Sequence, residues 1–328
     1  MNSFVFAVNS VAPIIIMAAI GYILKKVGIL PLPFANVANK LVFRVLLPAM
    51  LFLNVYNIED FSGAGMGYVL YAALALVSIF IIAIPLVMLV TKHYRLRRSL
   101  LQATFRSNNA LIGIPLAQSL FGAQGVVAAS LLAAIIIPMF NILAVISLSL
   151  FMEDTQRPSA KKILLGIVKN PLVDSIFCGL LALFVRRLFV ETGIDFRLSD
   201  ITPLYSVLNS FSSAATPIAI LVLGAQFEFS AVAELKREIV FGTLMRIVVF
   251  PTLVIGVAYF FFSDVFTGAH FATFVAAFAT PVAVSSVPMA QEMDGDVTLS
   301  GQLVVWSTLF SSLTIFLFAF VLKSIGIF

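Results

Sequence analysis

The chain has 328 residues, of which 61% are hydrophobic and only 11% are charged, and its mean hydropathy is +1.11. A soluble domain carries about 25% charged residues, so this composition excludes a soluble globular protein and indicates an integral membrane protein. The net charge of +5 comes from basic residues in short loops, which is a topology signal and not a nucleic-acid-binding patch, and the single Cys178 excludes an internal disulfide and a multi-cysteine metal site. No nucleic-acid partner, metal or cofactor is expected.

Apolar segments predict ten transmembrane helices, because each is long enough to cross a hydrocarbon core that needs about 20 residues. In chain order the expected helices cover residues 4–25, 37–57, 66–91, 99–121, 125–152, 163–189, 201–227, 238–263, 270–292 and 297–323. The fourth and fifth belong to one uncharged run, which Gly122-Ala-Gln-Gly125 divides. The fold class is therefore an all-α integral membrane protein.

Basic residues gather in alternate loops, and this bias predicts the orientation. The richer side holds Lys25, Lys26, Lys40, Lys92, Arg95, Arg97, Arg98, Arg157, Lys161, Lys162, Lys236 and Arg237, and the poorer side holds Arg186, Arg187, Arg197 and Lys323. We expect a multi-pass protein of the cell inner (plasma) membrane with both termini on the outer, periplasmic side. The acidic loop 292–296 falls on the basic side, against the trend. Arg44 and Arg246 are expected to anchor the membrane interface.

The sequence also contains an internal repeat. "IPLAQSLFG" (114–122) and "VPMAQEMDG" (287–295) share proline, alanine, glutamine and glycine at one constant offset, in the fourth and ninth expected helices. This match predicts two five-helix repeats, residues 1–152 and 163–328, joined by a cytoplasmic linker, 153–162. Because five is odd, the repeats are inverted relative to each other.

Both matching helices carry signals for interruption, namely Gly113 and Pro115 in the fourth and Pro281 and Pro288 in the ninth. Proline removes a helix hydrogen bond and clashes with the preceding turn. In lipid the freed backbone groups must find partners or line a wet cavity. Interrupted helices at matching positions of inverted repeats therefore predict a binding site at the membrane midplane. The alternative is that the prolines only kink packed helices.

Exposed N–H groups and helix dipoles at such a site attract an anion. Polar side chains beside the interruptions can cap the helix ends or donate hydrogen bonds to the ligand. These candidates are Asn108, Asn109, Ser285 and Ser286.

Five further polar residues have open roles. Arg106 can balance a bound anion, reach toward cytoplasmic headgroups, or pair with Asp174. Asp174 can carry a coupling proton, or it can cap the start of its helix beside a lysine. Asn141 can contact the ligand or bridge helices. Gln118 and Gln291 can supply oxygens to a coupling cation or hydrogen-bond each other.

Four stretches carry a resemblance to a known family: "SNNALIGIPLAQSLFG" (107–122), "LVFRVLLPAMLFLNV" (41–55), "VAPIIIMAAIGYILKKVGIL" (11–30) and "GDVTLSGQLVVWSTLFSSLT" (295–314). Over essentially its whole length, the chain resembles bacterial members of the auxin efflux carrier family, relatives of the plant PIN transporters. The resemblance implies ten helices in two inverted five-helix repeats, with broken helices 4 and 9 crossing. It also implies scaffold and transport domains, elevator-type alternating access, a homodimer and an organic-anion substrate. An asparagine that contacts the substrate carboxylate in PIN-type members matches Asn109.

These observations predict a secondary transporter of small organic anions, such as malate, malonate or auxin-like acids. Its partners would be the anion, the lipid bilayer and a coupling proton or sodium ion. No nucleophile–base pairing indicates an enzyme. Two alternatives stay open: a sodium- or proton-coupled carrier of other solutes on the same fold, and a membrane receptor that does not transport.

Overall fold

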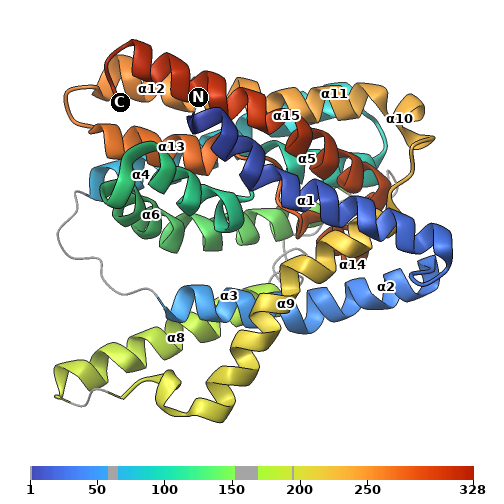
Figure 1. Cartoon of the computed structure of the whole chain (residues 1–328), viewed down its shortest axis with the longest axis horizontal. Helices are drawn as coiled ribbons and strands as arrows, with labels where there is room; N and C mark the ends of the chain where they lie inside the picture. The colour runs from blue at the N-terminus through green and yellow to red at the C-terminus, as the bar shows by residue number, and fades with distance from the viewer. Residues whose placement is uncertain (1, 58–65, 152–168, 194–195) are drawn as a thin grey trace.

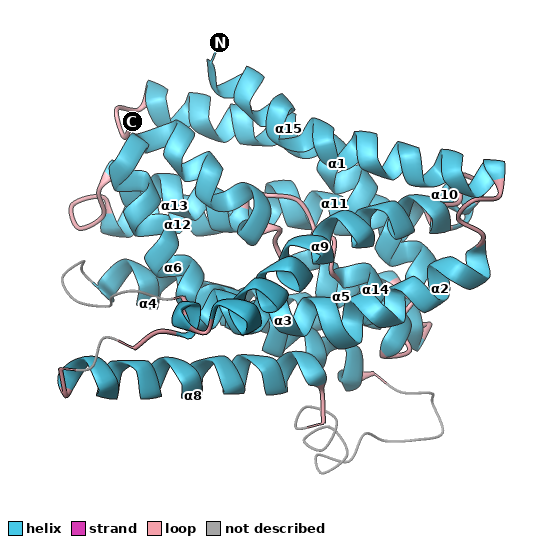
Figure 2. Cartoon of the chain, turned by 60° about the horizontal axis from the view of Figure 1, so that its bottom comes forward, coloured by secondary structure: helices cyan, strands magenta, loops and turns pink. Residues whose placement is uncertain are grey.

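The structure, a computed structural model, describes residues 2–57, 66–151, 169–193 and 196–328, without the side chains of residues 2–11, 110 and 111. In these ranges the secondary structure is helical, apart from one isolated antiparallel bridge between Ser107 and Val282. The all-α class is therefore confirmed for the described part of the chain. Figures 1 and 2 show the helices from two directions, and in both the two termini lie near each other.

The first half of the chain contains two π turns, one within the stretch Leu32–Tyr56 and one directly before the helix that begins at Ile114. Its elements are α1 (Asn2–Val27), α2 (Leu32–Leu41), η1 (Val42–Leu46), α3 (Leu47–Tyr56), α4 (Met66–Val90), α5 (Tyr94–Phe105), η2 (Asn109–Gly113) and α6 (Ile114–Leu150).

The second half begins with α8, and the expected helix start at residue 163 lies outside the described residues. Its elements are α8 (Pro171–Glu191), η3 (Leu198–Asp200), α9 (Thr202–Gln226), α10 (Ala231–Glu234), α11 (Lys236–Leu244), η4 (Met245–Val249), α12 (Phe250–Phe262), α13 (Gly268–Phe278), α14 (Ser286–Glu292) and α15 (Val297–Ser324).

Six helical stretches in the described part of the chain are long and apolar enough to cross a membrane. They are Leu32–Tyr56, Met66–Val90, Ile114–Leu150, Thr202–Gln226, Lys236–Phe262 and Val297–Ser324. Large apolar side chains on these helices face outward, and Phe260 and Phe261 of α12 are 79% and 76% exposed. Six apolar stretches of this length, with large apolar side chains facing outward, are typical of a multi-pass membrane protein.

A glycine divides α6 into two helices. Phe121 and Gly122 have non-helical backbone angles, and Gly122 adopts φ 60°, a conformation that favours glycine. Gly125 lies so close to the carbonyl of Ala117 that a Cβ there would clash with it. The tight reversal confirms the expected division between the fourth and fifth helices.

Each π turn is followed immediately by a proline near the start of the next helix. Pro48 follows η1, Pro115 follows η2 and Pro251 follows η4. A proline cannot donate to the carbonyl four residues earlier and clashes with it. At η1 and η4 the wider π turn relieves that clash, so the helix continues in the same general direction.

The helices form two groups (Figure 1). In the first group α2 and α3 pack against α9, and α8 packs on α3, while α1 packs along both α9 and α15. The second group contains α4, α5, α6 and α11–α15. Gly21 of α1 abuts the Leu221 carbonyl, and Gly224 of α9 abuts the Ala18 carbonyl, so only glycine permits this backbone contact.

The acidic loop that opposed the orientation trend lies among basic residues. Glu292 pairs with Arg44 at 3.3 Å, and Asp294 pairs with Arg95 at 2.6 Å and Arg98 at 3.2 Å. These contacts join η1 and the start of α5 to the end of α14 and the loop that follows it. The loop therefore adds no separate acidic surface, because Arg44, Arg95 and Arg98 neutralise two of its carboxylates.

Candidate functional site

The two interruptions lie against each other in antiparallel register. The backbone N–H of Asn108 donates to the carbonyl of Pro281 at 2.8 Å, and the N–H of Ala283 donates to the carbonyl of Arg106 at 3.3 Å. Each segment thus supplies partners for backbone groups that the other helix interruption has freed. The result is a crossing of two broken helices, α5–α6 and α13–α14.

Two of the three prolines that were expected to cause the interruptions lie after them in the chain. The non-helical residues after α5 come before η2, and Pro115 sits in the first turn of α6, where its missing N–H leaves no helix bond unmade. Pro288 likewise lies in the first turn of α14, whereas Pro281 belongs to the interruption itself. Gly113 ends η2, and a Cβ at this position would overlap the side-chain oxygen of Asn109.

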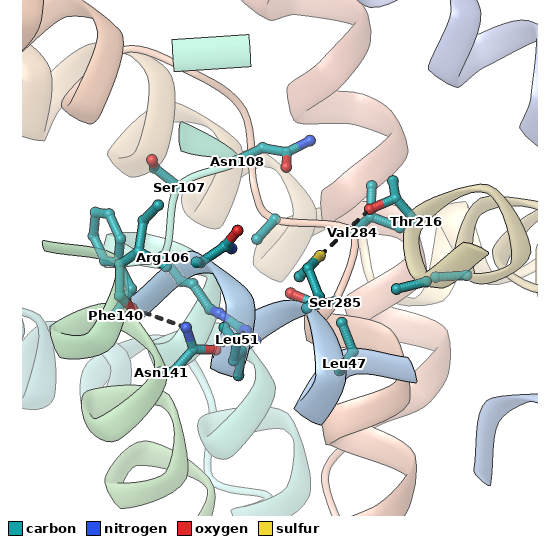
Figure 3. Close-up of a pocket in the computed structure, with 16 residues that line it drawn as sticks. Leu47, Leu51, Arg106, Ser107, Asn108, Phe140, Asn141, Thr216, Val284 and Ser285 are labelled. Carbon is teal, nitrogen blue, oxygen red and sulfur yellow. Dashed lines mark hydrogen bonds between the residues drawn. The ribbon is translucent and has the colours of Figure 1, made fainter. Parts of the chain in front are cut away.

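A cavity of about 50 Å³ opens at this crossing, with room for a few water-sized groups. Its walls come from both interruptions and from α3, α6 and α9 (Figure 3). The lining residues are Leu47, Met50, Leu51, Asn54, Arg106, Ser107, Asn108, Ile137, Phe140, Asn141, Ala215, Thr216, Ala219, Ala283, Val284 and Ser285.

The only positive side chain in this lining, Arg106, is 3% exposed. Its Nη2 donates to Oδ1 of Asn141 at 2.7 Å, and its Nη1 donates to the sulfur of Met289. A thioether is a weak acceptor, and a guanidinium has five N–H donors. No carboxylate in the described ranges forms an ion pair with Arg106. A buried cation with so few acceptors is costly, and an anion in the cavity would supply the missing partner.

Amide and hydroxyl groups complete the polar part of the cavity. Asn108 is buried, and its Nδ2 has no hydrogen-bond partner among the residues described. Asn141 donates to the carbonyl of Ile137 at 2.8 Å, which fixes its oxygen toward Arg106. Ser107 accepts from Thr280 at 3.2 Å. Asn108 thus adds an amide donor without a partner to the polar part of the crossing.

Comparison with known proteins identifies the family of this chain. The profile of a family described as membrane transport protein matches residues 6–319. The chain belongs to this family, the auxin efflux carrier family. A relative from Methanothermobacter thermautotrophicus, named "uncharacterized transporter", is 23% identical, and the match covers 97% of this chain and 99% of the relative. The expected family is confirmed, and its members are transporters and not enzymes.

Within this auxin efflux carrier protein, four of the expected site residues line the cavity together: Arg106, Asn108, Asn141 and Ser285. Asn109 is buried but packs on Gly113. Ser286 is buried just beyond the lining, and its hydroxyl lacks a partner among the described residues. The contact of Arg106 is with Asn141 and not with Asp174.

Three expected residues of this carrier lie away from the crossing. Asp174 is exposed in the first turn of α8, and Gln118 is exposed on α6. Gln291 joins a cluster of amides, in which its Oε1 accepts from Asn39 at 2.6 Å and from Gln226 at 3.0 Å. That cluster connects α14 with α2 and α9, so Gln291 holds the two helix groups together.

Arg246 was expected at the membrane interface, and that expectation is wrong. Its side chain is 0% exposed and donates to the carbonyls of Phe105 at 2.8 Å, Thr280 at 3.0 Å and Ala277 at 3.3 Å. The position of Arg246 along its helix suggested a depth near the membrane interface. The side chain instead donates to backbone carbonyls at the ends of the interrupted α5 and α13. Its place in the π turn before Pro251 is the one local signal of this role.

The contribution of α9 to the cavity was also missed. Ala215, Thr216 and Ala219 lie on one face of that helix, beside Pro217. Small residues next to a proline are the available sequence signal, but they are equally typical of close helix packing.

Proposed function

We propose that the protein is a secondary active transporter of small organic anions and that the substrate's carboxylate binds at the crossing. The observation that carries this proposal is the buried Arg106, which lines the cavity with a weak sulfur acceptor and one amide oxygen as partners. A carboxylate accepts two parallel bonds from a guanidinium. Substrate binding would therefore provide acceptors for donors of Arg106 that Asn141 and Met289 do not use.

The surrounding groups fit the rest of a small organic acid. Asn108 and Ser285 stand beside Arg106 as further donors, while Leu51 and Phe140 belong to an apolar wall. One cation and a few neutral polar groups favour carboxylates such as malate, malonate or auxin-like acids over cations. Asn109 and Gly113, together with the proline turns, would hold the shape of the crossing.

The position of the cavity supports alternating access. One wall comes from α3 and α9 of the first helix group, and the other comes from α6 and the interruptions of the second. A sliding of one group against the other would expose the crossing to each side in turn, as in an elevator. The proposal includes ten spans in two inverted repeats, 1–152 and 163–328, a homodimer, and both termini outside the cell inner membrane.

Uptake by proteoliposomes tests this function. Radiolabelled malate, malonate and indole-3-acetate would be offered under imposed pH and sodium gradients, which also separates proton coupling from sodium coupling. We expect saturable uptake of at least one acid, strongly reduced in Asn141→Leu, because the support of Arg106 is lost. Asn209→Leu, an exposed position on α9, is the matched control and should retain uptake.

The outcome also separates the rival functions. Saturable binding of an acid without flux would contradict transport and favour a receptor. Flux of neutral or cationic solutes, with none of any acid, would contradict the anion site.

A further inference from the structure

Two helix C-termini meet at the crossing, and a single side chain serves both. Arg246, in η4, donates from Nη1 to the carbonyl of Phe105, the last residue of α5. Its Nη2 and Nε donate to the carbonyls of Ala277 and Thr280, at the end of α13 and just beyond it. These three oxygens come from two interrupted helices that are far apart in the sequence.

Carbonyls at such positions are unusually strong cation ligands. The end of a helix carries roughly half a negative charge, because its last carbonyls lack helical N–H partners. In transporters with discontinuous helices, unwound carbonyls and half-helix C-termini coordinate sodium. At this crossing the guanidinium of Arg246 already occupies oxygens of both ends.

We propose that Arg246 is a built-in cation, which takes the place of an alkali ion at the crossing. Its fixed charge compensates the two negative helix ends, so that Arg106 and the donors of the cavity determine the sign of the ligand. The carbonyls of Phe105, Ala277 and Thr280 consequently require no dissolved cation. What the inference says about the transported ligand rests on the proposed anion transport. The claim that Arg246 takes the place of a dissolved cation does not.

An arginine suits this role better than a lysine would. Its planar fork presents donors in several fixed directions, whereas an ammonium is a compact point charge. The three carbonyls belong to different segments, and each receives a different nitrogen of Arg246. The side chain thus positions α5 and α13 relative to each other while it supplies charge.

Thermal unfolding of the purified full chain in detergent tests the inference without a substrate. Midpoints are compared in sodium, potassium and choline chloride at equal ionic strength. The wild type should melt at one temperature in all three salts. Arg246→Ala should melt lower in choline and recover partly in sodium or in millimolar guanidinium. Arg95→Ala, which removes an ion pair whose two side chains are 58% and 50% exposed, should show no cation-specific response.

Transport provides the second readout. Carboxylate flux by the wild type should be the same in sodium and choline at fixed pH and membrane potential. Arg246→Lys keeps the charge but loses donors, so its flux should fall while remaining independent of sodium. This variant and the wild-type salt series decide the question even if Arg246→Ala does not fold.

Three results would overturn the inference. They are a sodium-specific rise in the wild-type midpoint or flux, an Arg246→Ala protein that matches the wild type without added cation, and a loss of stability that neither sodium nor guanidinium restores. Absence of carboxylate flux would instead contradict the proposed function and leave the salt series interpretable.

Discussion

Replacement of Arg106 by glutamine tests the central element of the proposed site. In the structure the guanidinium is buried, with Asn141 and the sulfur of Met289 as its hydrogen-bond partners. A carboxylate in the cavity would accept two charge-assisted bonds, worth about 1.5–3 kcal/mol each. Glutamine keeps one neutral donor, so the expected loss is about 3 kcal/mol, or roughly 100-fold in half-saturation concentration.

The assay is concentration-dependent uptake by proteoliposomes, with thermal unfolding measured on the same preparations. Arg95→Gln is the control, because both side chains of its pair with Asp294 are exposed and the pair should contribute little to stability. Thermal stability of Arg106→Gln should equal or exceed that of the wild type, since removal of an undercompensated buried charge is neutral or stabilising. Loss of affinity without loss of stability separates a binding role from a structural one.

Unchanged half-saturation in Arg106→Gln would refute the reasoning. A large fall in its unfolding midpoint would also refute it, because the guanidinium would then stabilise the packed core instead of binding an anion.

The remaining predictions concern packing, the amide cluster and coupling. Gly224→Val should lower stability by about 2–3 kcal/mol, because the new side chain would overlap the backbone of α1. Gly256→Ala meets open space inside α12 and should raise stability by about 0.5–1 kcal/mol. Equal effects of the two variants in thermal unfolding would contradict this packing. Gln291→Leu removes the acceptor of the buried Asn39 and the partly buried Gln226 and should cost about 1–3 kcal/mol. At the exposed Gln118, the change to Leu should alter stability by less than about 0.5 kcal/mol, and the reverse order would exclude the cluster as a stabilising contact. Asp174→Asn should remove at most about 1 kcal/mol of helix-dipole stabilisation and should leave the pH dependence of uptake unchanged. If that pH dependence disappeared, Asp174 would be the carrier of the coupling proton.

Much of the helix layout is predictable because it depends on local chemistry. Hydropathy and helix length placed α4, α9 and α15 within a few residues of their observed ends. Gly122 marked the reversal within α6, because its positive φ is a property of a single residue. The prolines were read less accurately. A proline indicates that a helix is irregular nearby, but it does not give the exact position of the irregularity. Before Pro115 the backbone already forms an interruption and then a π turn.

The candidate site depended on contacts that no local pattern contains. Asn108 and Asn109 are adjacent and equally polar, yet Asn108 lines the cavity and Asn109 packs on Gly113. The direction of each side chain follows from the path of the backbone through the interruption. That path is fixed by pairing with a segment near Pro281, a distant part of the chain.

The sequence by itself determined that this is a helical membrane transporter of the auxin efflux carrier family. Span length, apolar composition and family motifs are local properties of consecutive residues. Only the tertiary structure decided how the buried charges are used. Arg106 and Asn141 meet from the α5–α6 region, and Arg246 reaches a carbonyl 141 residues away. A cation in lipid surroundings needs oxygen partners, and folding alone determines which oxygens come within reach.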